Sequence, residues 1–358
     1  MRGVACVTMD PVSGCGPMIF LVDAGPDAGL GHVQRCLALA HALRGLGFDS
    51  VFLPGPDASV RRRIAAQGFQ CAGETRPGSD GQDLRGLVEV AQQLQAGGVV
   101  IDSYRLSPRR LAGLRETGLI VAMIDDVGSE SLPCHLVISP GFVRWKAATG
   151  TPAGKHRLLG PSYALLGPDY WQRDRRATRG EIRKIVVTLG GSGSPALLRR
   201  AVSWLEPFAK TITVAVVKGP YLSALPELPG CEILVLEAPD SLAPWLREAD
   251  LAISGGGQTL YELAAVGTPA VAIELARNQR DTVRGMAAAG AAIPAGRAAD
   301  PRLDEAGRRA VQRLMRNALL RRRMSAAGQR LIDGGGAARV ADALRDLLRA
   351  AQPAMARA

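Results

Sequence analysis

MIFLVDAGPDAGLGHVQRCLALAHAL, residues 18–43, is the stretch that decides the fold. Its first part, residues 18–23, is a continuous apolar run of the kind that forms a strand buried on both faces. A Gly-rich loop follows, and residues 32–47 then have the Ala- and Leu-rich composition of a helix. A buried strand, a Gly-rich turn and a helix make the opening unit of a doubly wound α/β sheet.

The same alternation continues outward from this unit. In the first half, further strands are predicted at 50–53, 98–102, 119–125 and 136–139. The polar stretch 167–184 interrupts the pattern, which restarts with strands at 185–189, 212–217, 232–236, 251–254 and 270–274 and about three helices from Pro301 onward. We therefore predict an α/β protein with two Rossmann-like doubly wound domains that face a cleft. Its parts are a disordered leader at 1–17, a first domain at 18–166, a linker at 167–184 and a nucleotide-binding second domain at 185–358.

The composition narrows the class of protein. Of 358 residues, 47% are hydrophobic and 22% charged, as in a globular protein long enough for two domains. The net charge of +11 comes mainly from Arg in Ala- and Leu-rich segments, such as 61–63 and 321–323, which we expect to be solvated helix faces. With 4% aromatic residues and no reader motif, nucleic-acid binding is not expected. Scattered cysteines, no apolar run of bilayer length and no signal-peptide pattern at 1–17 predict a cytoplasmic protein.

Three Gly-rich loops follow predicted strands and open predicted helices, at residues 28–32, 190–194 and 254–259. Glycine lets the backbone approach a ligand closely, and the helix N-terminus offers unpaired N–H groups to an anion. None of the loops has Walker A or complete G-x-G-x-x-G spacing. Two of them lie in the second domain, so we predict that a nucleotide binds there, through Gly190, Gly191, Gly256, Gly257, Gln258 and Thr259.

Glu262 lies four residues after Gln258, so the two side chains share a helix face one turn apart. A carboxylate one turn inside a phosphate-binding helix can reach the hydroxyls of a ribose. We predict this role for Glu262; the alternative is a solvent-exposed helical glutamate.

His32 is one of four histidines, and it stands in the first Gly-rich loop at the carboxyl end of the first strand. A helix N-terminus lowers the pKa of an imidazole and favours the neutral base. Gly29 and Gly31 on either side would let a sugar approach. We predict that His32 is catalytic; the alternative is a purely structural histidine.

Two acidic strand ends, at residue 102 and at residues 125–126, should face the same cleft. Their spacing does not match a His, Cys or Asp metal site, and aspartates at strand ends often cap the next helix. We therefore predict no metal.

Several segments resemble one enzyme family, the UDP-2,4-diacetamido-2,4,6-trideoxy-β-L-altropyranose hydrolases of pseudaminic acid biosynthesis. The resemblance rests on GLGH–RCLALA at 29–40, DSY at 102–104, DD at 125–126, GPSYALL at 160–166, GG at 190–191, Glu262 and the pair at 278–279. Residues 254–273 also look like the donor-binding half of the lipid-II-forming N-acetylglucosaminyltransferase.

The resemblance implies a cofactor-free, metal-independent hydrolysis. Water activated by His32 would attack the anomeric carbon of a UDP-linked deoxy-amino sugar, UDP would leave and the configuration would invert. It implies sugar-binding positions at Asp23, Tyr104, Asn278 and Gln279, and nucleotide-binding positions at Gly191, Gly257 and Glu262.

The sequence also departs from that family, with Leu21 and Ser103 where the family has Arg and His. These departures leave the sugar open. The alternative function is an inverting glycosyltransferase that uses a UDP-sugar donor in surface polysaccharide or glycolipid synthesis. Membrane association is expected only for such a transferase, and no apolar stretch adjoins the basic run 61–63 that would support it. A non-catalytic binder is the third reading, and from the sequence alone we favour the hydrolase.

Overall fold

The apolar runs form two parallel sheets in the structure, a computed structural model that describes residues 16–23, 30–72, 82–104, 106–128, 132–142, 156–172, 180–190, 193–219, 231–237 and 239–355. The strands of the first sheet are β1 (Met18–Val22), β2 (Ser50–Pro54), β3 (Gln70–Cys71), β4 (Gly98–Asp102), β5 (Ile120–Ile124), β6 (Leu136–Ser139) and β7 (His156–Leu159). The strands of the second sheet are β8 (Lys184–Thr188), β9 (Thr213–Lys218), β10 (Glu232–Glu237), β11 (Leu251–Gly255), β12 (Ala270–Glu274) and β13 (Ala292–Arg297).

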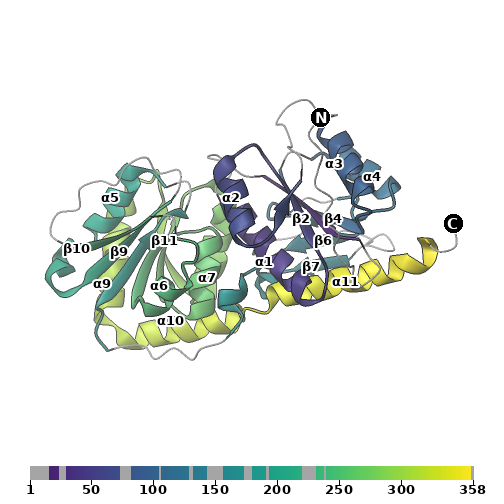
Figure 1. Ribbon diagram of the computed structural model, residues 1–358. Helices are drawn as coiled ribbons and strands as arrows, with labels where there is room; N and C mark the ends of the chain where they lie inside the picture. Colours follow the sequence, from purple (N-terminus) through teal and green to yellow (C-terminus); the bar gives the residue numbers. More distant parts are fainter. Residues whose placement is uncertain are drawn as a thin grey trace.

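Helices cover both faces of each sheet. In the first half they are α1 (Gly31–Gly45), α2 (Ala58–Ala66), α3 (Gln82–Gln93) and α4 (Pro108–Glu116). In the second half they are α5 (Pro195–Ser203), α6 (Ala243–Glu248), α7 (Gln258–Val266), α8 (Arg280–Ala288), α9 (Leu303–Arg316), α10 (Ala318–Leu331) and α11 (Gly336–Met355). Short 3₁₀ helices are η1 (Pro161–Tyr163), η2 (Pro168–Tyr170), η4 (Glu206–Thr211) and η5 (Arg277–Gln279). The predicted fold class, two doubly wound Rossmann-like domains, is confirmed (Figure 1).

The pleat of each strand explains why the sequence shows continuous apolar runs. In β1, Phe20 faces the core under α1 and α2, whereas Ile19 and Leu21 face the core under α3 and α4. In β8, Val186 faces the core under α6 and α7, and Val187 faces the core under α5 and α9. Because successive side chains point to opposite, equally covered faces, apolar residues are required at every position.

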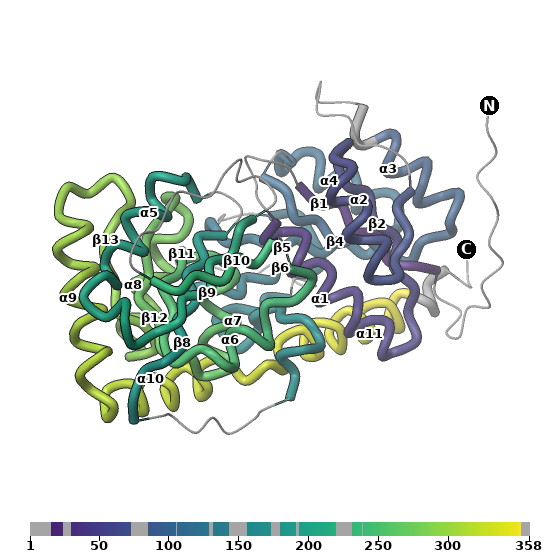
Figure 2. Tube along the Cα trace, turned by 60° about the vertical axis from the view of Figure 1, so that its left-hand side comes forward, coloured from purple at the N-terminus to yellow at the C-terminus, as the bar shows by residue number. Residues whose placement is uncertain are grey.

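The position of the C-terminal helix α11 differs from the expectation that residues 185–358 form one domain. Val340, Leu344 and Leu348 belong to the core beneath α1 in the first domain. Figure 1 shows α11 running back along the first domain, and Figure 2 shows it beside α1, which it contacts. The second sheet already has both faces covered, whereas the core beside α1 uses the apolar side of α11.

The chain therefore crosses between the domains twice, and the two crossings touch. A Cβ at Gly334, whose φ is +79°, would lie 2.2 Å from the carbonyl oxygen of Tyr170. A Cβ at Gly336 would lie 2.2 Å from the carbonyl oxygen of Ala164. Glycine permits this close approach of backbones. Within the predicted linker 167–184, residues 173–179 lie outside the described residues, as do residues 1–15 of the predicted leader.

The strand order positions the cleft. It is β3-β2-β1-β4-β5-β6-β7 in the first sheet and β10-β9-β8-β11-β12-β13 in the second. The direction of winding reverses between β1 and β4, where Val22 pairs with Asp102, and between β8 and β11, where Thr188 pairs with Ser254. Ligands of open α/β sheets bind beyond the carboxyl ends of the strands at such switch points.

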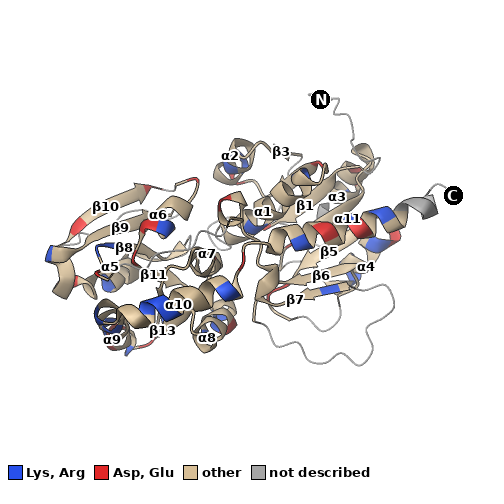
Figure 3. Ribbon diagram, turned by 90° about the horizontal axis from the view of Figure 1, so that it is seen from below, with Lys and Arg blue, Asp and Glu red and all other residues tan. Residues whose placement is uncertain are grey.

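Charges are spread over the outer helices. Seen from below in Figure 3, α11 contains residues of both signs and α10 contains basic residues. Arg322 and Arg323 on α10 are exposed, as predicted, but Arg321 is 1% exposed. Its guanidinium donates to the carbonyl oxygens of Leu314 (2.7 Å) and Gly180 (2.6 Å), so it joins the end of α9 to the chain before β8. No helix in the described part of the chain has the length and apolarity needed to cross a bilayer.

Candidate active site

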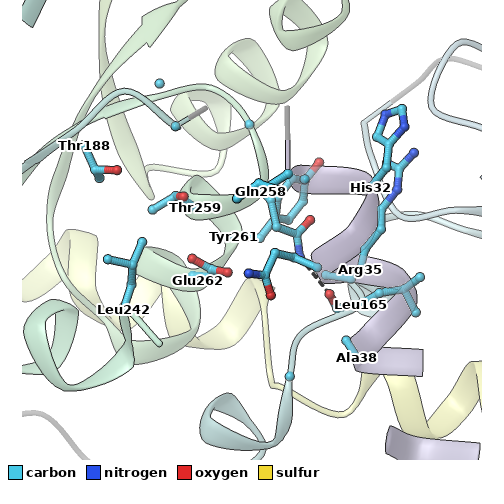
Figure 4. A pocket seen from close by; sticks show the side chains of 18 of the residues that line it. His32, Arg35, Ala38, Leu165, Thr188, Leu242, Gln258, Thr259, Tyr261 and Glu262 are labelled. Carbon is cyan, nitrogen blue, oxygen red and sulfur yellow. Dashed lines mark hydrogen bonds between the residues drawn. The ribbon is translucent and has the colours of Figure 1, made fainter. Parts of the chain in front are cut away.

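The two switch points enclose a cleft of about 350 Å³ between the domains (Figure 4). The wall from the first domain includes His32, Arg35 and Ala38 of α1, and the opposite wall includes Thr259 and Glu262 of α7. The cleft that the sequence predicted is therefore present, with the predicted base and the predicted nucleotide loops on opposite sides.

His32 is the second residue of α1 and is 7% exposed. Burial lowers the pKa of His32, the nearby carboxylate of Asp102 opposes this shift and the charge of Arg35 adds to it. The imidazole is therefore neutral at neutral pH. The sequence attributed this state to the helix N-terminus, whereas burial is its main cause. The Nδ1 atom of His32 is 3.7 Å from Oδ1 of Asp102, and the ring contacts that of Tyr104 edge-on at 5.1 Å between centroids.

Asp102 is engaged mainly by Arg35. The Nε and Nη2 atoms of Arg35 donate to both carboxylate oxygens of Asp102 at 2.5 Å each, and Nη1 donates to Asp126 at 3.0 Å. Arg35 and Asp102 are 7% and 1% exposed. Burial works against the charge of Arg35, but Asp102 and Asp126 raise its pKa well above the ordinary value. This ion cluster fixes the first turns of α1, and with them the position of His32.

Tyr104 connects this cluster to the second domain. Its hydroxyl donates to Oδ1 of Asp126 at 2.7 Å and accepts a long hydrogen bond from Asn278 at 3.4 Å. Asp23 accepts hydrogen bonds from the hydroxyl of Ser103 (2.9 Å) and the backbone N–H of Tyr104 (3.2 Å). The predicted sugar-binding residues Asp23, Tyr104 and Asn278 are thus brought together, and Asp23 shapes the turn after β4.

The loop after β11 is braced by Gln279. The Oε1 atom of Gln279 accepts from the backbone N–H groups of Gly256 (3.0 Å) and Leu275 (3.1 Å). The N–H of Gly256 also donates to the carbonyl of Ile273, and a Cβ at Gly256 would lie 2.4 Å from Val283. Gly256 and Gln279 therefore shape the loop, and both line the cleft into which the sequence predicts that they bind ligand.

The N-terminus of α7 faces the cleft. Gly257 is its N-cap and provides no side-chain cap, so backbone N–H groups of the first turn remain for a ligand. The side chain of Gln258 donates to the carbonyl of Leu165 at 2.7 Å, which ties this helix to the first crossing between domains (Figure 4). Across the cleft, a Cβ at Gly31 would lie 3.9 Å from the Cβ of Gln258. Gly190 lies in the cleft wall at φ +68°, and Gly29 and Gly191 lie outside the described residues.

Glu262 lies in the cleft wall one turn further along α7 (Figure 4). Burial raises the pKa of Glu262 to about 7, against the opposing influence of hydrogen bonds from Tyr170 and Thr259 and of the charge of Arg63. It is therefore a carboxylate near the midpoint of its titration at neutral pH, and not the exposed helical residue of the alternative interpretation.

Three residues of this site were not predicted. Arg35 could have been found, because it lies three residues after His32 and so on the same side of α1. Arg63, which donates to the carbonyl of Pro239 across the cleft at 2.8 Å, was grouped with solvated charges. Tyr170 lies in the stretch assigned to the linker, yet it packs in the core of the second domain. Among the described residues, no group of three or more His, Cys, Asp or Glu side chains is placed to hold a metal ion.

Comparison with known proteins places the chain in a class. No family model matches it. Relatives include an uncharacterised protein of Methanocaldococcus jannaschii, 22% identical over 73% of this chain, and the spore coat polysaccharide biosynthesis protein SpsG of Bacillus subtilis, 29% identical over 52% of it. The matches span 56% and 58% of the lengths of those two relatives.

A third relative is the UDP-N-acetylglucosamine–N-acetylmuramyl-(pentapeptide) pyrophosphoryl-undecaprenol N-acetylglucosamine transferase of Gloeobacter violaceus. It is 30% identical over 305 residues, which cover 72% of this chain and 81% of that enzyme. Among solved structures, MurG of Acinetobacter baumannii has a TM-score of 0.63 at 18% identity, covering 92% of this chain and 99% of that one. The spinosyn rhamnosyltransferase SpnG complexed with thymidine diphosphate has a TM-score of 0.60 at 17% identity, with the same coverage.

These likenesses define the class of the protein as the glycosyltransferase-B-like superfamily of nucleotide-sugar enzymes. Within that superfamily, the chain belongs to the family of the Gloeobacter violaceus N-acetylglucosamine transferase. The narrower membership of a UDP-sugar hydrolase family, expected from the GLGH and GPSYALL segments, is not supported by these comparisons.

Proposed function

We propose that this protein is an inverting glycosyltransferase, which takes a sugar from a UDP-linked donor and passes it to an acceptor hydroxyl. The observation that carries the proposal is the cleft itself, in which the N-terminus of α7 and Glu262 face His32 across the domain boundary. The relatives reverse the order of preference reached from the sequence, because the Gloeobacter violaceus relative is by name a transferase that uses UDP-N-acetylglucosamine.

The second domain would hold the donor. The backbone N–H groups at the start of α7 suit the diphosphate, because they are unpaired donors at the positive end of a helix dipole. Glu262, one turn further in, suits the two ribose hydroxyls. SpnG, a protein of the same fold, has been solved in complex with thymidine diphosphate, another pyrimidine nucleoside diphosphate.

The first domain would supply the base. His32 is neutral and held in the cleft wall by the buried Arg35–Asp102 pair, so it can accept the proton of an acceptor hydroxyl. The hydroxyl oxygen forms a bond to the anomeric carbon, the bond from that carbon to the diphosphate oxygen breaks, and UDP leaves with the electron pair. The start of α7 would stabilise the charge that develops on the leaving group.

Hydrolysis is the second candidate, and the GLGH–RCLALA and GPSYALL segments favour it. The same base would then activate water, and the cleft would need no acceptor site. The two functions differ in one measurable respect, the need for an acceptor.

The test has two arms. Calorimetry with UDP and with GDP examines the donor site, and we expect UDP to bind more tightly; equal or absent binding of UDP would contradict the proposal. Turnover of a panel of UDP-sugars is then followed by UDP release, alone and with the N-acetylmuramyl-(pentapeptide) pyrophosphoryl-undecaprenol acceptor named for the relative or with simple hydroxyl acceptors. Acceptor-dependent release supports the transferase. Sustained release with free sugar and no acceptor supports the hydrolase instead.

A further inference from the structure

One ring nitrogen of His32 is left without a hydrogen bond. The Nδ1 atom is buried and makes no hydrogen bond to any described residue, although Oδ1 of Asp102 lies 3.7 Å away. Buried polar atoms are nearly always paired, so an unpaired nitrogen beside a carboxylate needs a physical reason. The other contacts of Asp102 provide that reason.

Both carboxylate oxygens of Asp102 accept hydrogen bonds from other groups. The Nη2 atom of Arg35 donates to Oδ1 at 2.5 Å, and the Nε atom of Arg35 donates to Oδ2 at 2.5 Å. The thiol of Cys36, a weak donor, lies 3.6 Å from Oδ2. These two residues follow His32 by three and four positions on α1, so they share the side of the helix that faces the carboxylate. The guanidinium is the strongest of these donors, because its charge is permanent and its fork matches both oxygens.

Carboxylates surround the imidazole of His32, and a guanidinium opposes them. The titratable groups that face it, from each element packed around it in the described part of the chain, are Asp23 after β1, Asp102 of β4, Tyr104 after β4, Asp126 after β5 and Arg35 of its own helix α1. An imidazole paired with an ionised carboxylate is stabilised as the cation, which cannot accept a proton. A base for an acceptor hydroxyl must therefore be kept out of such a pair until the proton is transferred.

From this geometry we infer that Arg35 is a positioning residue of the proposed base, which occupies both oxygens of Asp102 and thereby prevents an ion pair between Asp102 and His32. The inference rests on the proposed function, because it takes His32 to be the base. Since Nδ1 is buried, Nε2 is the nitrogen that meets the acceptor hydroxyl, and the neutral imidazole carries its proton on Nδ1. Arg35 then has a task in the reaction besides its structural one in the ion cluster.

The inference has a pH signature. Burial lowers the pKa of His32 below its usual value of 6.5, Asp102 acts in the opposite direction, and the charge of Arg35 supports the lowering. Only the neutral imidazole accepts a proton, so turnover is complete above this pKa and falls as the pH drops through it. A hydrogen bond from Nδ1–H to ionised Asp102 favours the imidazolium and raises the pKa, so the loss of turnover then begins at a higher pH.

The first measurement is an NMR titration of the imidazole groups in the ligand-free protein. The chain has four histidines, and His32→Gln assigns the signals of His32. In the wild type we expect a midpoint below 6.5 and ¹⁵N shifts that show no strong hydrogen bond at Nδ1. Arg35→Lys keeps the charge but replaces the fork by one ammonium group, which leaves Oδ1 of Asp102 available to Nδ1–H. The midpoint of His32 should then rise by about one unit, and the ¹⁵N shifts should show the new hydrogen bond.

The second measurement is the pH dependence of kcat/KM for acceptor-dependent release of UDP, which reports the ionisation of the free enzyme. The acid limb of Arg35→Lys should move upward by the same interval as the NMR midpoint. The ratio of wild-type to variant kcat/KM should therefore be roughly ten near pH 5 and approach about one near pH 9. Affinity for UDP should be unchanged, because the proposed nucleotide site lies on the other side of the cleft.

Arg44→Lys is the matched control, since it makes the same exchange on the same helix. Arg44 is exposed, and its guanidinium donates to the carbonyl of Gly68 at 2.6 Å. This variant should leave both the midpoint of His32 and kcat/KM unchanged at every pH. Melting temperatures of the two Lys variants show whether each fold is intact.

The wild type alone can overturn the inference, through a His32 midpoint above about 7 together with a hydrogen-bonded Nδ1–H. An unchanged midpoint in folded Arg35→Lys would mean that Arg35 only supports the fold, and the proposed function would stand without this inference. If the midpoint rises but the acid limb of kcat/KM does not move, His32 is not the base, and the proposed mechanism fails. If the wild type neither binds UDP nor releases it, the proposed function fails, whatever the NMR titration shows.

Discussion

The two switch points of this molecule have the same topology and opposite chemistry. At the first, between β1 and β4, ionisable side chains crowd together, with His32, Arg35, Asp102 and Asp126 within one cluster. At the second, between β8 and β11, Gly190 and the residues 255–257 line the cleft, and the start of α7 has backbone N–H groups without a side-chain cap.

This contrast suits a division of two tasks between the switch points, in which one recognises an anion and the other transfers a proton. A fixed polyanion is recognised by backbone amides, which carry no charge to desolvate and can be brought close where side chains are small. Proton transfer needs a side chain whose pKa is set by its surroundings, and such a group must be held by others. The first switch point therefore contains buried charges and the second contains glycines.

The largest effect should come from His32. Replacement by Gln removes the base and keeps a polar side chain of similar size, so turnover should fall by about 10²–10⁴, the usual contribution of a positioned general base. UDP affinity should stay within about twofold of the wild-type value, because the proposed nucleotide site lies on the other side of the cleft. His156→Gln, at an exposed position of β7, is the matched control. Wild-type turnover in a folded His32→Gln protein would contradict the proposal that the first domain supplies the base.

Asp102→Asn should have the next largest effect, and it should appear in stability. The change leaves the guanidinium of Arg35 buried with one carboxylate fewer, and breaking a buried pair costs about 3–5 kcal/mol of the free energy of unfolding. Denaturant unfolding measures it. Glu248→Gln breaks the exposed pair with Lys184 in the second domain, where about 0–1 kcal/mol is expected. Equal effects of the two variants would show that the first cluster is not the stabilising feature we take it to be.

Gly256→Ala should weaken the binding of UDP. The added methyl group would lie 2.4 Å from Val283 and 3.2 Å from the Cβ of Gln279, so the loop that precedes α7 must move. Overpacking of this kind typically costs about 1–3 kcal/mol, and we expect a loss of UDP affinity in that range, measured by calorimetry. Gly113→Ala in α4, where nothing lies within 4 Å, should leave affinity unchanged. Retained affinity in Gly256→Ala would mean that loop shape does not determine nucleotide binding.

The smallest effect should come from Tyr104→Phe, which cuts the link between the first switch point and the second domain. The hydroxyl is lost from a half-exposed side chain, and its bonds to Asp126 and Asn278 are 2.7 and 3.4 Å long. We expect about 0.5–1.5 kcal/mol in kcat/KM, with the melting temperature nearly unchanged. A loss comparable to that of His32→Gln would instead make the Tyr104 hydroxyl part of the reaction.

The sequence predicted those parts of the fold that local patterns determine. The buried strands β1, β4 and β11 are continuous apolar runs, so they were predicted within a residue or two. The strands β7 and β13 were missed, because β7 is a half-exposed edge and β13 contains Pro and Gly. A short or exposed strand carries no periodic signal of its own.

Tertiary placement was the harder part. The amphipathic pattern of α11 marks a helix, but it does not say which sheet the helix covers. Likewise, Gly-rich loops pointed to His32 and to the N-terminus of α7, whereas the contact of Arg63 with the carbonyl of Pro239 depends on how the chain brings α2 against the second domain. Such partners are set by the path of the chain and not by spacing within one helix.

The return of α11 has a consequence for how the molecule is made. The core beneath α1 is incomplete without Val340, Leu344 and Leu348, so the first domain leaves the ribosome before the second but waits longer for its last packing partner. Domains generally fold as they emerge, N-terminal part first. Here the order of completion is inverted, since the second sheet and its helices are finished by Leu331. The first domain is closed by a helix that is synthesised after every strand of the second sheet.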